Sequence, residues 1–168
     1  MSSVDQINAL AAGELDAAFV YRQDNIVEDS IAIHPLRYDN VVLAASIDLL
    51  FDHEGPLSLE DIDGLPVVAF PGAVAAAYHD RLFDALRGIG FEANIVQEGS
   101  DETTRLSLVS AGVGCAFVNS ANMQRPPWQV QFRQVAGLSV PIVFLFLTRL
   151  TPGNLTQLLT DTVTQIDA

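Results

Sequence analysis

The residues best suited to hold a small ligand lie in the stretch 98–120. Ser100 directly precedes the expected helix 102–111, and its hydroxyl can cap that helix by accepting a hydrogen bond from an amide of the first turn. Asp101 places negative charge at the positive end of the helix dipole. Helix N-termini bind small anions and polar groups. We therefore expect Gly99, Ser100 and Asp101 to contact a ligand; an ordinary helix cap is the alternative.

The same stretch continues with a helix end, a tight turn and a strand. Gly112 stands where helices commonly end in a left-handed conformation. Gly114 permits a sharp turn into the apolar run 115–118, which is typical of a buried strand in an α/β sheet. Asn119 follows this strand, and its side chain either faces a ligand or stabilises the turn.

Two further places combine a strand end with polar or flexible residues. Tyr21 follows the expected strand 15–20, at a carboxyl end where ligands gather in α/β proteins. Pro71 and Gly72 follow another strand and open the expected helix 73–88, whose first backbone amides can hold an oxyanion.

The hydrophobic pattern predicts the elements that position these residues. Expected helices cover 4–12, 58–62, 73–88, 102–111 and 152–166, and expected strands cover 15–20, 30–38, 41–46, 66–70, 92–97, 115–118, 130–135 and 140–147. Such alternation predicts an α/β fold with mixed, mostly parallel sheets and helices on both faces. In the last helix the pattern predicts that the apolar residues are buried, namely Leu155, Leu158, Leu159 and Val163.

Composition and charge exclude several classes of function for this chain. Its 168 residues are 49% apolar, which is typical of a folded globular protein. The net charge of −13, from 21 acidic residues against 8 Lys and Arg, is opposite to what binding the DNA backbone requires. No apolar run is long enough for a membrane span, and the first residues lack the pattern of a secretory signal. A single cysteine excludes an internal disulfide and fits a cytoplasmic protein.

The sequence gives no pattern of catalytic or metal-binding residues. His34, His53 and His79 are not at metal-ligand spacing, and no Gly-x-Ser-x-Gly nucleophile motif is present. Cys115 lies inside an apolar strand, where cysteines are usually inert. We expect no enzyme, no cofactor and no metal site.

Three sequence patterns resemble one family. Ser100-Asp101, a helix, Ala-Gly-Val-Gly at 111–114, an apolar strand and a polar loop resemble the effector-binding domain of LysR-type transcriptional regulators. The residues 10–16 are similar to the family's Leu-x-x-Gly-x-Leu-Asp signature between a helix and a strand, and 57–62 also resemble the family. These domains share the two-lobed fold of type 2 periplasmic binding proteins.

The resemblance implies a domain organisation and a function. The first lobe would comprise 1–40 and 124–168, lacking the family's first strand, helix and strand, and the second lobe would comprise 41–123. This implies a truncated fragment, or strands supplied by another chain. A small carboxylate or polar effector would bind between the lobes. Ser2 or Ser3 can cap the first-lobe helix, and Ser3 would match the family's capping hydroxyl that faces this effector. Tyr21 stands where some relatives place a carboxylate-binding arginine.

The resemblance also implies partners. The parent protein would form a homodimer or homotetramer and bind DNA only through a domain absent from this chain, without membrane contact. Two alternatives remain: a solute-binding protein of the same fold, and a dimerisation module without a ligand.

Overall fold

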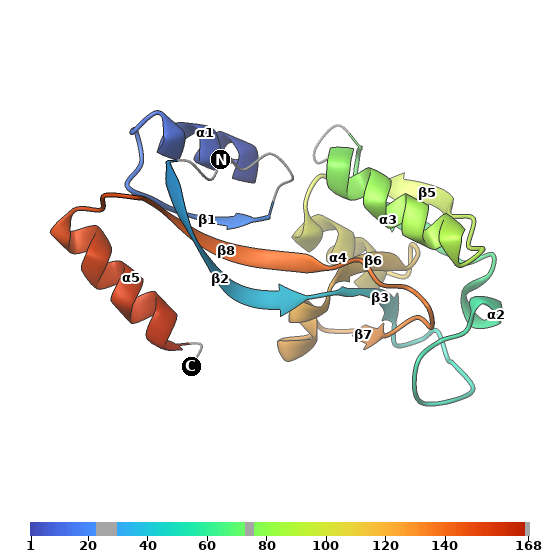
Figure 1. Cartoon of the computed structure of the whole chain (residues 1–168). Helices are drawn as coiled ribbons and strands as arrows, with labels where there is room; N and C mark the ends of the chain where they lie inside the picture. The colour runs from blue at the N-terminus through green and yellow to red at the C-terminus, as the bar shows by residue number, and fades with distance from the viewer. Residues whose placement is uncertain (23–29, 73–75, 167–168) are drawn as a thin grey trace. The chain divides into compact units, whose positions relative to one another are not determined.

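The computed structural model describes residues 1–22, 30–72 and 76–166 (Figure 1). The chain divides into two compact units. Unit 1 comprises Met1–Asp39 and Pro141–Ala168, and unit 2 comprises Asn40–Val140. Unit 2 is therefore inserted into unit 1, with one chain segment leading into it and another leading back.

Unit 1 is built on a three-stranded antiparallel sheet with the order β1-β8-β2. Its elements are α1 (Ser3–Ala11), β1 (Ala17–Tyr21), β2 (Ile31–Asp39), β8 (Ile142–Arg149) and α5 (Asn154–Ile166). The chain leaves unit 1 along β2 and returns along β8, so these two strands run in opposite directions. Pro35 lies in β2 at the edge of this sheet, where its missing N–H is tolerated.

Helix α1 packs against one face of this sheet. Ser2 caps the helix by accepting a hydrogen bond from the Asp5 backbone N–H at 3.1 Å, and Gly13 follows the helix with a φ of 77°. Ile7 and Leu10 of α1 belong to one buried cluster with strand residues such as Leu145. The core of unit 1 therefore lies between α1 and the sheet.

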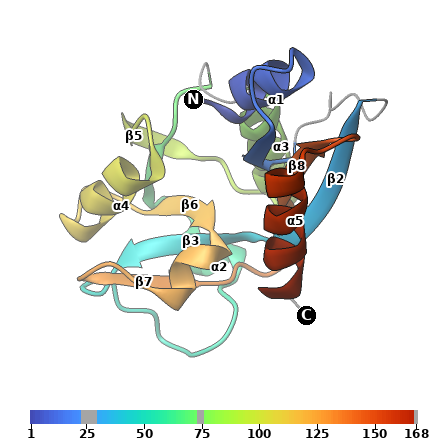
Figure 2. The same ribbon diagram turned by 90° about the vertical axis from the view of Figure 1, so that its left-hand side faces the viewer.

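Unit 2 contains the remaining elements. They are β3 (Val41–Ser46), α2 (Leu59–Ile62), β4 (Pro66–Ala69), α3 (Ala76–Gly88), β5 (Asn94–Glu98), α4 (Glu102–Ser110), β6 (Ala116–Asn119), the 3-10 helix η1 (Ser120–Gln124) and β7 (Val130–Arg133). Strands β6, β3 and β7 lie side by side in that order and pair antiparallel (Figure 2). Strand β4 pairs parallel with β5, and Val67 of β4 forms a parallel bridge with Cys115, the residue directly before β6.

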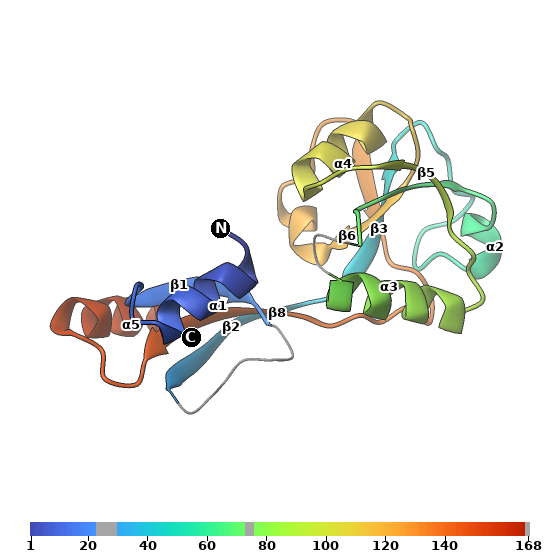
Figure 3. The same ribbon diagram turned by 90° about the horizontal axis from the view of Figure 1, so that it is seen from above.

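The core of unit 2 lies beneath α4. All residues of β3 are buried, and Val42 packs in one cluster with Leu106 and Val109 of α4. Helices α3 and α4 flank the strands from different sides (Figure 3). At the turn after α4, a Cβ on Gly114 would lie 2.6 Å from the Pro66 carbonyl oxygen, so this position requires glycine.

Most expected elements are present, and three expectations need correction. The segment 124–140, expected in the first lobe, belongs to unit 2 because β7 pairs with β3. The α/β class is confirmed, but within the described ranges four of the five strand pairings are antiparallel, whereas mostly parallel pairing was expected. The first three residues of the expected helix 73–88 lie outside the described residues.

The third correction concerns the face that α5 buries. Leu155 and Leu158 are 84% and 64% exposed, whereas Thr156 and Thr160 are only 9% and 8% exposed. The Thr160 hydroxyl donates to the Thr156 carbonyl oxygen at 2.8 Å. Because the helix itself satisfies this buried hydroxyl, the threonine side can face inward. Among the described residues, no helix is long and apolar enough to cross a membrane.

Candidate functional site

The ends of three strands in unit 2 meet the beginning of a helix. Strands β4, β5 and β6 are connected by parallel pairings, so their carboxyl ends lie at the same edge. The backbone N–H of Gly99, which follows β5, donates to the carbonyl oxygen of Ala69, the last residue of β4, at 2.9 Å. Helix α4 begins three residues after Gly99. In α/β folds, ligands bind at such an edge.

The first turn of α4 is capped by Asp101 and not, as expected, by Ser100. The Asp101 carboxylate accepts hydrogen bonds from the Thr104 backbone N–H at 2.8 Å and the Thr104 hydroxyl at 2.7 Å. These bonds, led by the one from the amide, lower the pKa of Asp101. A carboxylate is a stronger acceptor than a hydroxyl, so it takes the cap. Ser100 is exposed, and its hydroxyl donates a hydrogen bond to Asp101 Oδ2 at 3.3 Å.

Helix α4 also carries a buried cation, Arg105, which was not among the residues expected to form the site. Arg105 is only 6% exposed. Its Nη1 donates to the Phe117 carbonyl oxygen at 2.9 Å, and its Cζ lies 5.2 Å from the centre of the Phe70 ring. Burial lowers the pKa of Arg105. A signal was present in the sequence, because Arg105 is three and four residues from Glu102 and Val109, on the inward face of α4.

Asn119 has the turn-stabilising role, the second of the two that the sequence left open. Its Oδ1 accepts a hydrogen bond from the Ala121 backbone N–H at 2.8 Å, which caps η1. Its own backbone N–H donates to Glu102 Oε2 at 3.3 Å. The side-chain Nδ2 is buried and has no hydrogen-bond partner among residues 1–22, 30–72 and 76–166. Asn119 therefore shapes the turn and still has a donor to offer.

The other candidates of unit 2 lie at the end of β4. Pro71 and Gly72 are half-buried and follow Phe70. A Cβ on Gly72 would lie 3.6 Å from the ring of His79, so the backbone passes close to this side chain. The His79 ring packs edge-on against the Phe70 ring, with 5.5 Å between their centres. The rings of Phe70 and His79 thus lie beside the backbone here, and the Arg105 guanidinium lies over the Phe70 ring.

The two expected ligand contacts of unit 1, Ser3 and Tyr21, lie next to each other. The Tyr21 backbone N–H donates to the Ser3 hydroxyl oxygen at 3.3 Å, which links the start of α1 to the end of β1. Ser3 is the first residue of the helix, and of the two caps that the sequence allows, Ser2 and Ser3, the structure has Ser2. The Tyr21 side chain is partly exposed and packs against Phe144, with 5.3 Å between ring centres.

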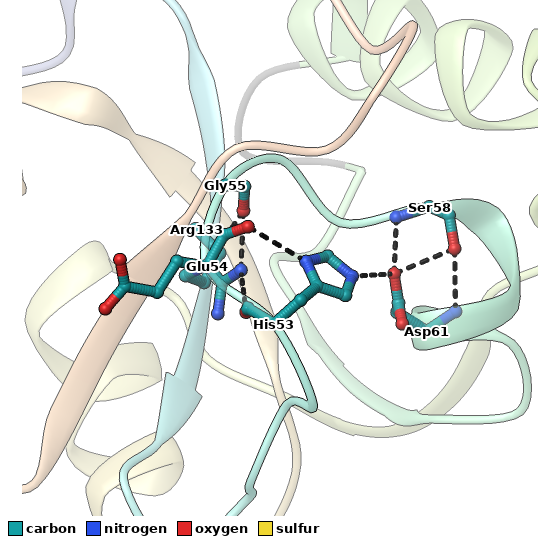
Figure 4. A network of polar contacts seen from close by, with 6 residues as sticks. All are labelled: His53, Glu54, Gly55, Ser58, Asp61 and Arg133. Carbon is teal, nitrogen blue, oxygen red and sulfur yellow. Dashed lines mark hydrogen bonds and ion pairs between the residues drawn. The ribbon is translucent and has the colours of Figure 1, made fainter.

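A second polar network occupies a different part of unit 2 (Figure 4). Nε2 of His53 lies 3.0 Å from Asp61 Oδ2, and Nδ1 lies 3.0 Å from the Glu54 carbonyl oxygen. Asp61 also accepts a hydrogen bond from the backbone N–H of Ser58, at 2.6 Å. Arg133 of β7 donates to the His53 carbonyl oxygen at 2.7 Å. This network attaches the loop before α2 to both α2 and β7.

Among the described residues, no three His, Cys, Asp or Glu side chains are grouped to hold a metal ion. The buried Cys115 thiol lies 3.3 Å from the Pro66 carbonyl oxygen, and burial raises the pKa of Cys115 to about 12. The edge of β4, β5 and β6 instead presents hydroxyl, amide and guanidinium donors.

Comparison with known proteins identifies the family to which the chain belongs. The model of the LysR substrate binding domain matches residues 1–165. The HTH-type transcriptional regulator IlvR of Caulobacter vibrioides is 35% identical over 112 residues, which cover 67% of this chain and 38% of the regulator. This chain therefore spans less than half of that relative.

Two solved structures share the fold at low sequence identity. Full-length CbnR complexed with its target DNA superimposes with a TM-score of 0.78 at 18% identity, covering 100% of this chain and 56% of CbnR. The effector-binding domain of BenM with its effector benzoate gives a TM-score of 0.75 at 18% identity, covering 99% of this chain and 75% of that one. The fold is that of type 2 periplasmic binding proteins, and the chain belongs to the LysR substrate-binding domain family.

Proposed function

We propose that this chain is the effector-sensing part of a LysR-type transcriptional regulator. The observation that carries the proposal is the meeting of the carboxyl ends of β4, β5 and β6 with the N-terminus of α4. A small carboxylate binds at this edge, in contact with Gly99, Ser100, Asp101 and Asn119. Pro71 and Gly72 complete the edge, and Ser3 and Tyr21 are the candidate contacts of unit 1.

The charge of the chain supports a parent protein in which one domain senses the ligand and another binds DNA. With a net charge of −13, the chain does not attract a DNA backbone, so the operator is read by another domain. The chain senses the ligand, and binding shifts the parent protein between conformations that differ in how its copies pair. The parent assembles as a homodimer or homotetramer and acts in the cytoplasm without a cofactor.

The first test is a thermal melt of the purified chain against paired small carboxylates and their neutral amides, beginning with benzoate and benzamide. We expect one class of carboxylate to raise the melting temperature in a saturable way. Ser100→Ala and Ser100→Glu should weaken the binding measured by calorimetry and leave the fold intact. Ser107→Ala is the matched control, because Ser107 lies in α4, the helix that follows Ser100, and its hydroxyl donates to the Thr103 carbonyl oxygen at 2.8 Å. Equal affinity in all four proteins would contradict the site.

One observation favours a second candidate, a module that pairs copies of the chain without a ligand. The apolar residues Leu155, Leu158 and Leu159 are exposed on α5. Exposed apolar patches mark association sites in soluble proteins. If pairing is the whole function, Leu155→Ser with Leu158→Ser makes a dimer monomeric in sedimentation experiments, and no compound changes the melting temperature.

A further inference from the structure

The carboxylate of Glu102 receives donors from three elements of unit 2. Its Oε1 accepts a hydrogen bond from Asn122 Nδ2 of η1 at 2.7 Å. Its Oε2 accepts the Asn119 backbone N–H of β6 at 3.3 Å and lies 3.6 Å from Arg105 Nη2 of α4. The Glu102 side chain is 37% exposed, so solvent reaches this group. Arg105, Asn119 and Asn122 thus form a carboxylate cradle, as we call these three residues below.

The carboxylate cradle contains buried N–H donors that the Glu102 carboxylate does not satisfy. Arg105 Nε and Asn119 Nδ2 both lack a hydrogen-bond partner in the described part of the chain. Arg105 is 6% exposed and Asn119 is 5% exposed. The Asn119 side-chain amide is fixed in this orientation, because its Oδ1 accepts a hydrogen bond from the Ala121 backbone N–H at 2.8 Å. Buried N–H groups without acceptors are costly, so these two point to an acceptor that the described residues do not supply.

The balance of charge also favours an incoming anion. The ion pair between Arg105 and Glu102 is long, at 3.6 Å, and Glu102 divides its oxygens among donors from Asn119 and Asn122 as well. A guanidinium has five N–H donors in a planar fork that matches a carboxylate. A ligand carboxylate in direct contact with the Arg105 guanidinium therefore forms a closer ion pair than Glu102 does.

We propose that Arg105, Asn119 and Asn122 form a carboxylate-binding site that Glu102 fills, and that the anionic group of the effector displaces Glu102 from it. This inference rests on the proposed function and deepens it. Arg105 becomes the residue that selects a carboxylate over a neutral ligand. Glu102 becomes an internal competitor, whose release reports that an effector is bound.

The first experiment empties the cradle and offers acetate as the probe. In Glu102→Ala, acetate should raise the melting temperature by about 3 °C at saturation, compared with chloride at equal ionic strength. The rise should disappear in Glu102→Ala/Arg105→Gln. Glu60→Ala is the matched control, because Glu60 is also a first-turn glutamate but lies exposed in α2, and it should give no specific response to acetate. A folded Glu102→Ala protein that responds equally to acetate and chloride would overturn the proposal.

The second experiment measures selectivity with the carboxylate and amide pairs. The wild-type chain should bind the carboxylate at least ten-fold more tightly than its amide, and Arg105→Gln should remove most of that preference. Arg87→Gln, at an exposed arginine of α3, should retain it. Glu102→Gln keeps the side-chain length, and it should bind the carboxylate several-fold more tightly than the wild type does. Unchanged selectivity in Arg105→Gln would overturn the inference.

These outcomes separate the inference from the proposed function. If acetate stabilises Glu102→Ala but no carboxylate binds the wild type, the cradle is supported and the proposed sensing function fails. If a carboxylate binds the wild type and Arg105→Gln equally well, the sensing function is supported and the role of Arg105 fails.

Discussion

Gly99 lies so close to Arg105 that a Cβ on Gly99 would stand 2.8 Å from the Arg105 Cγ and 3.2 Å from its backbone nitrogen. The glycine is therefore required by the neighbouring side chain and helix, since its own φ is not in the left-handed region. The close approach also holds the end of β5 against the first turn of α4. Placing a side chain at Gly99 should therefore disturb both the fold and the proposed ligand site.

Gly99→Ala should lower the free energy of unfolding by about 1–3 kcal/mol, because the added methyl group displaces Arg105 or the start of α4. Urea unfolding followed by circular dichroism measures this change. Gly88→Ala is the control, because no atom lies within 4 Å of a Cβ there and Gly88 is the last residue of α3. It should be neutral or slightly stabilising. Equal stability of the two variants would contradict the close approach.

The local features of α4 were predictable from the sequence because they depend on neighbouring residues. Gly112 takes a φ of 77° after the helix, as its position predicts. Leu106 and Val109 pack in the core of unit 2, as their spacing predicts. The cap moved by one residue, from Ser100 to Asp101, because two good capping residues stand side by side and only the three-dimensional geometry chooses between them.

The features that sequence reasoning missed depend on contacts between distant segments. Arg105 is buried because the Phe117 carbonyl oxygen and the Phe70 ring receive its guanidinium, and both come from other elements. The leucines of α5 are exposed because the threonine side of that helix can face inward with a satisfied hydroxyl. The boundary of unit 2 lies beyond β7 because β7 pairs with β3, far away in the sequence.

Truncating an apolar side chain should cost very different amounts in α4 and in α5. Leu106→Ala should lower the free energy of unfolding by about 2–4 kcal/mol, because Leu106 is buried in the core of unit 2. Leu158→Ala should change it by less than about 0.5 kcal/mol, because that side chain is 64% exposed. Urea unfolding of the monomeric chain compares the two variants. A large loss in Leu158→Ala would show that α5 buries its leucine face after all.

The Cys115 thiol should be unreactive while the chain is folded. Burial raises its pKa to about 12, so the thiolate is scarce at neutral pH and reagents have little access. A maleimide should label Cys115 slowly under native conditions and rapidly in concentrated urea, as intact-mass spectrometry would show. Cys115→Ala should retain ligand binding. Rapid labelling of the native chain would show that the segment leading into β6 opens readily.

The His53–Asp61 contact should make unit 2 most stable in mildly acidic solution. Both ring nitrogens of His53 lie opposite acceptors, Asp61 Oδ2 and the Glu54 carbonyl oxygen, so the full arrangement requires the doubly protonated ring. The hydrogen bond to the Glu54 carbonyl oxygen, followed by the one to Asp61, raises the pKa of His53 above 6.5. Hydrogen bonds from Ser58, and then His53, lower the pKa of Asp61 from 3.8 to about 2.

The two shifts define the pH range in which the contact stabilises the fold. A raised histidine pKa contributes stability below the ordinary value of 6.5, and this is lost as the pH rises through the raised value. A lowered aspartate pKa contributes stability above 3.8, and this is lost as the pH falls through about 2. The melting temperature of His53→Gln should therefore fall furthest below that of the wild type between about pH 4 and 6.5, and the difference should shrink by pH 9. In an Asp61→Asn background, His53→Gln should have a smaller effect, because its partner is already changed. A difference that is the same at pH 5 and pH 9 would show that the contact contributes nothing as an ion pair.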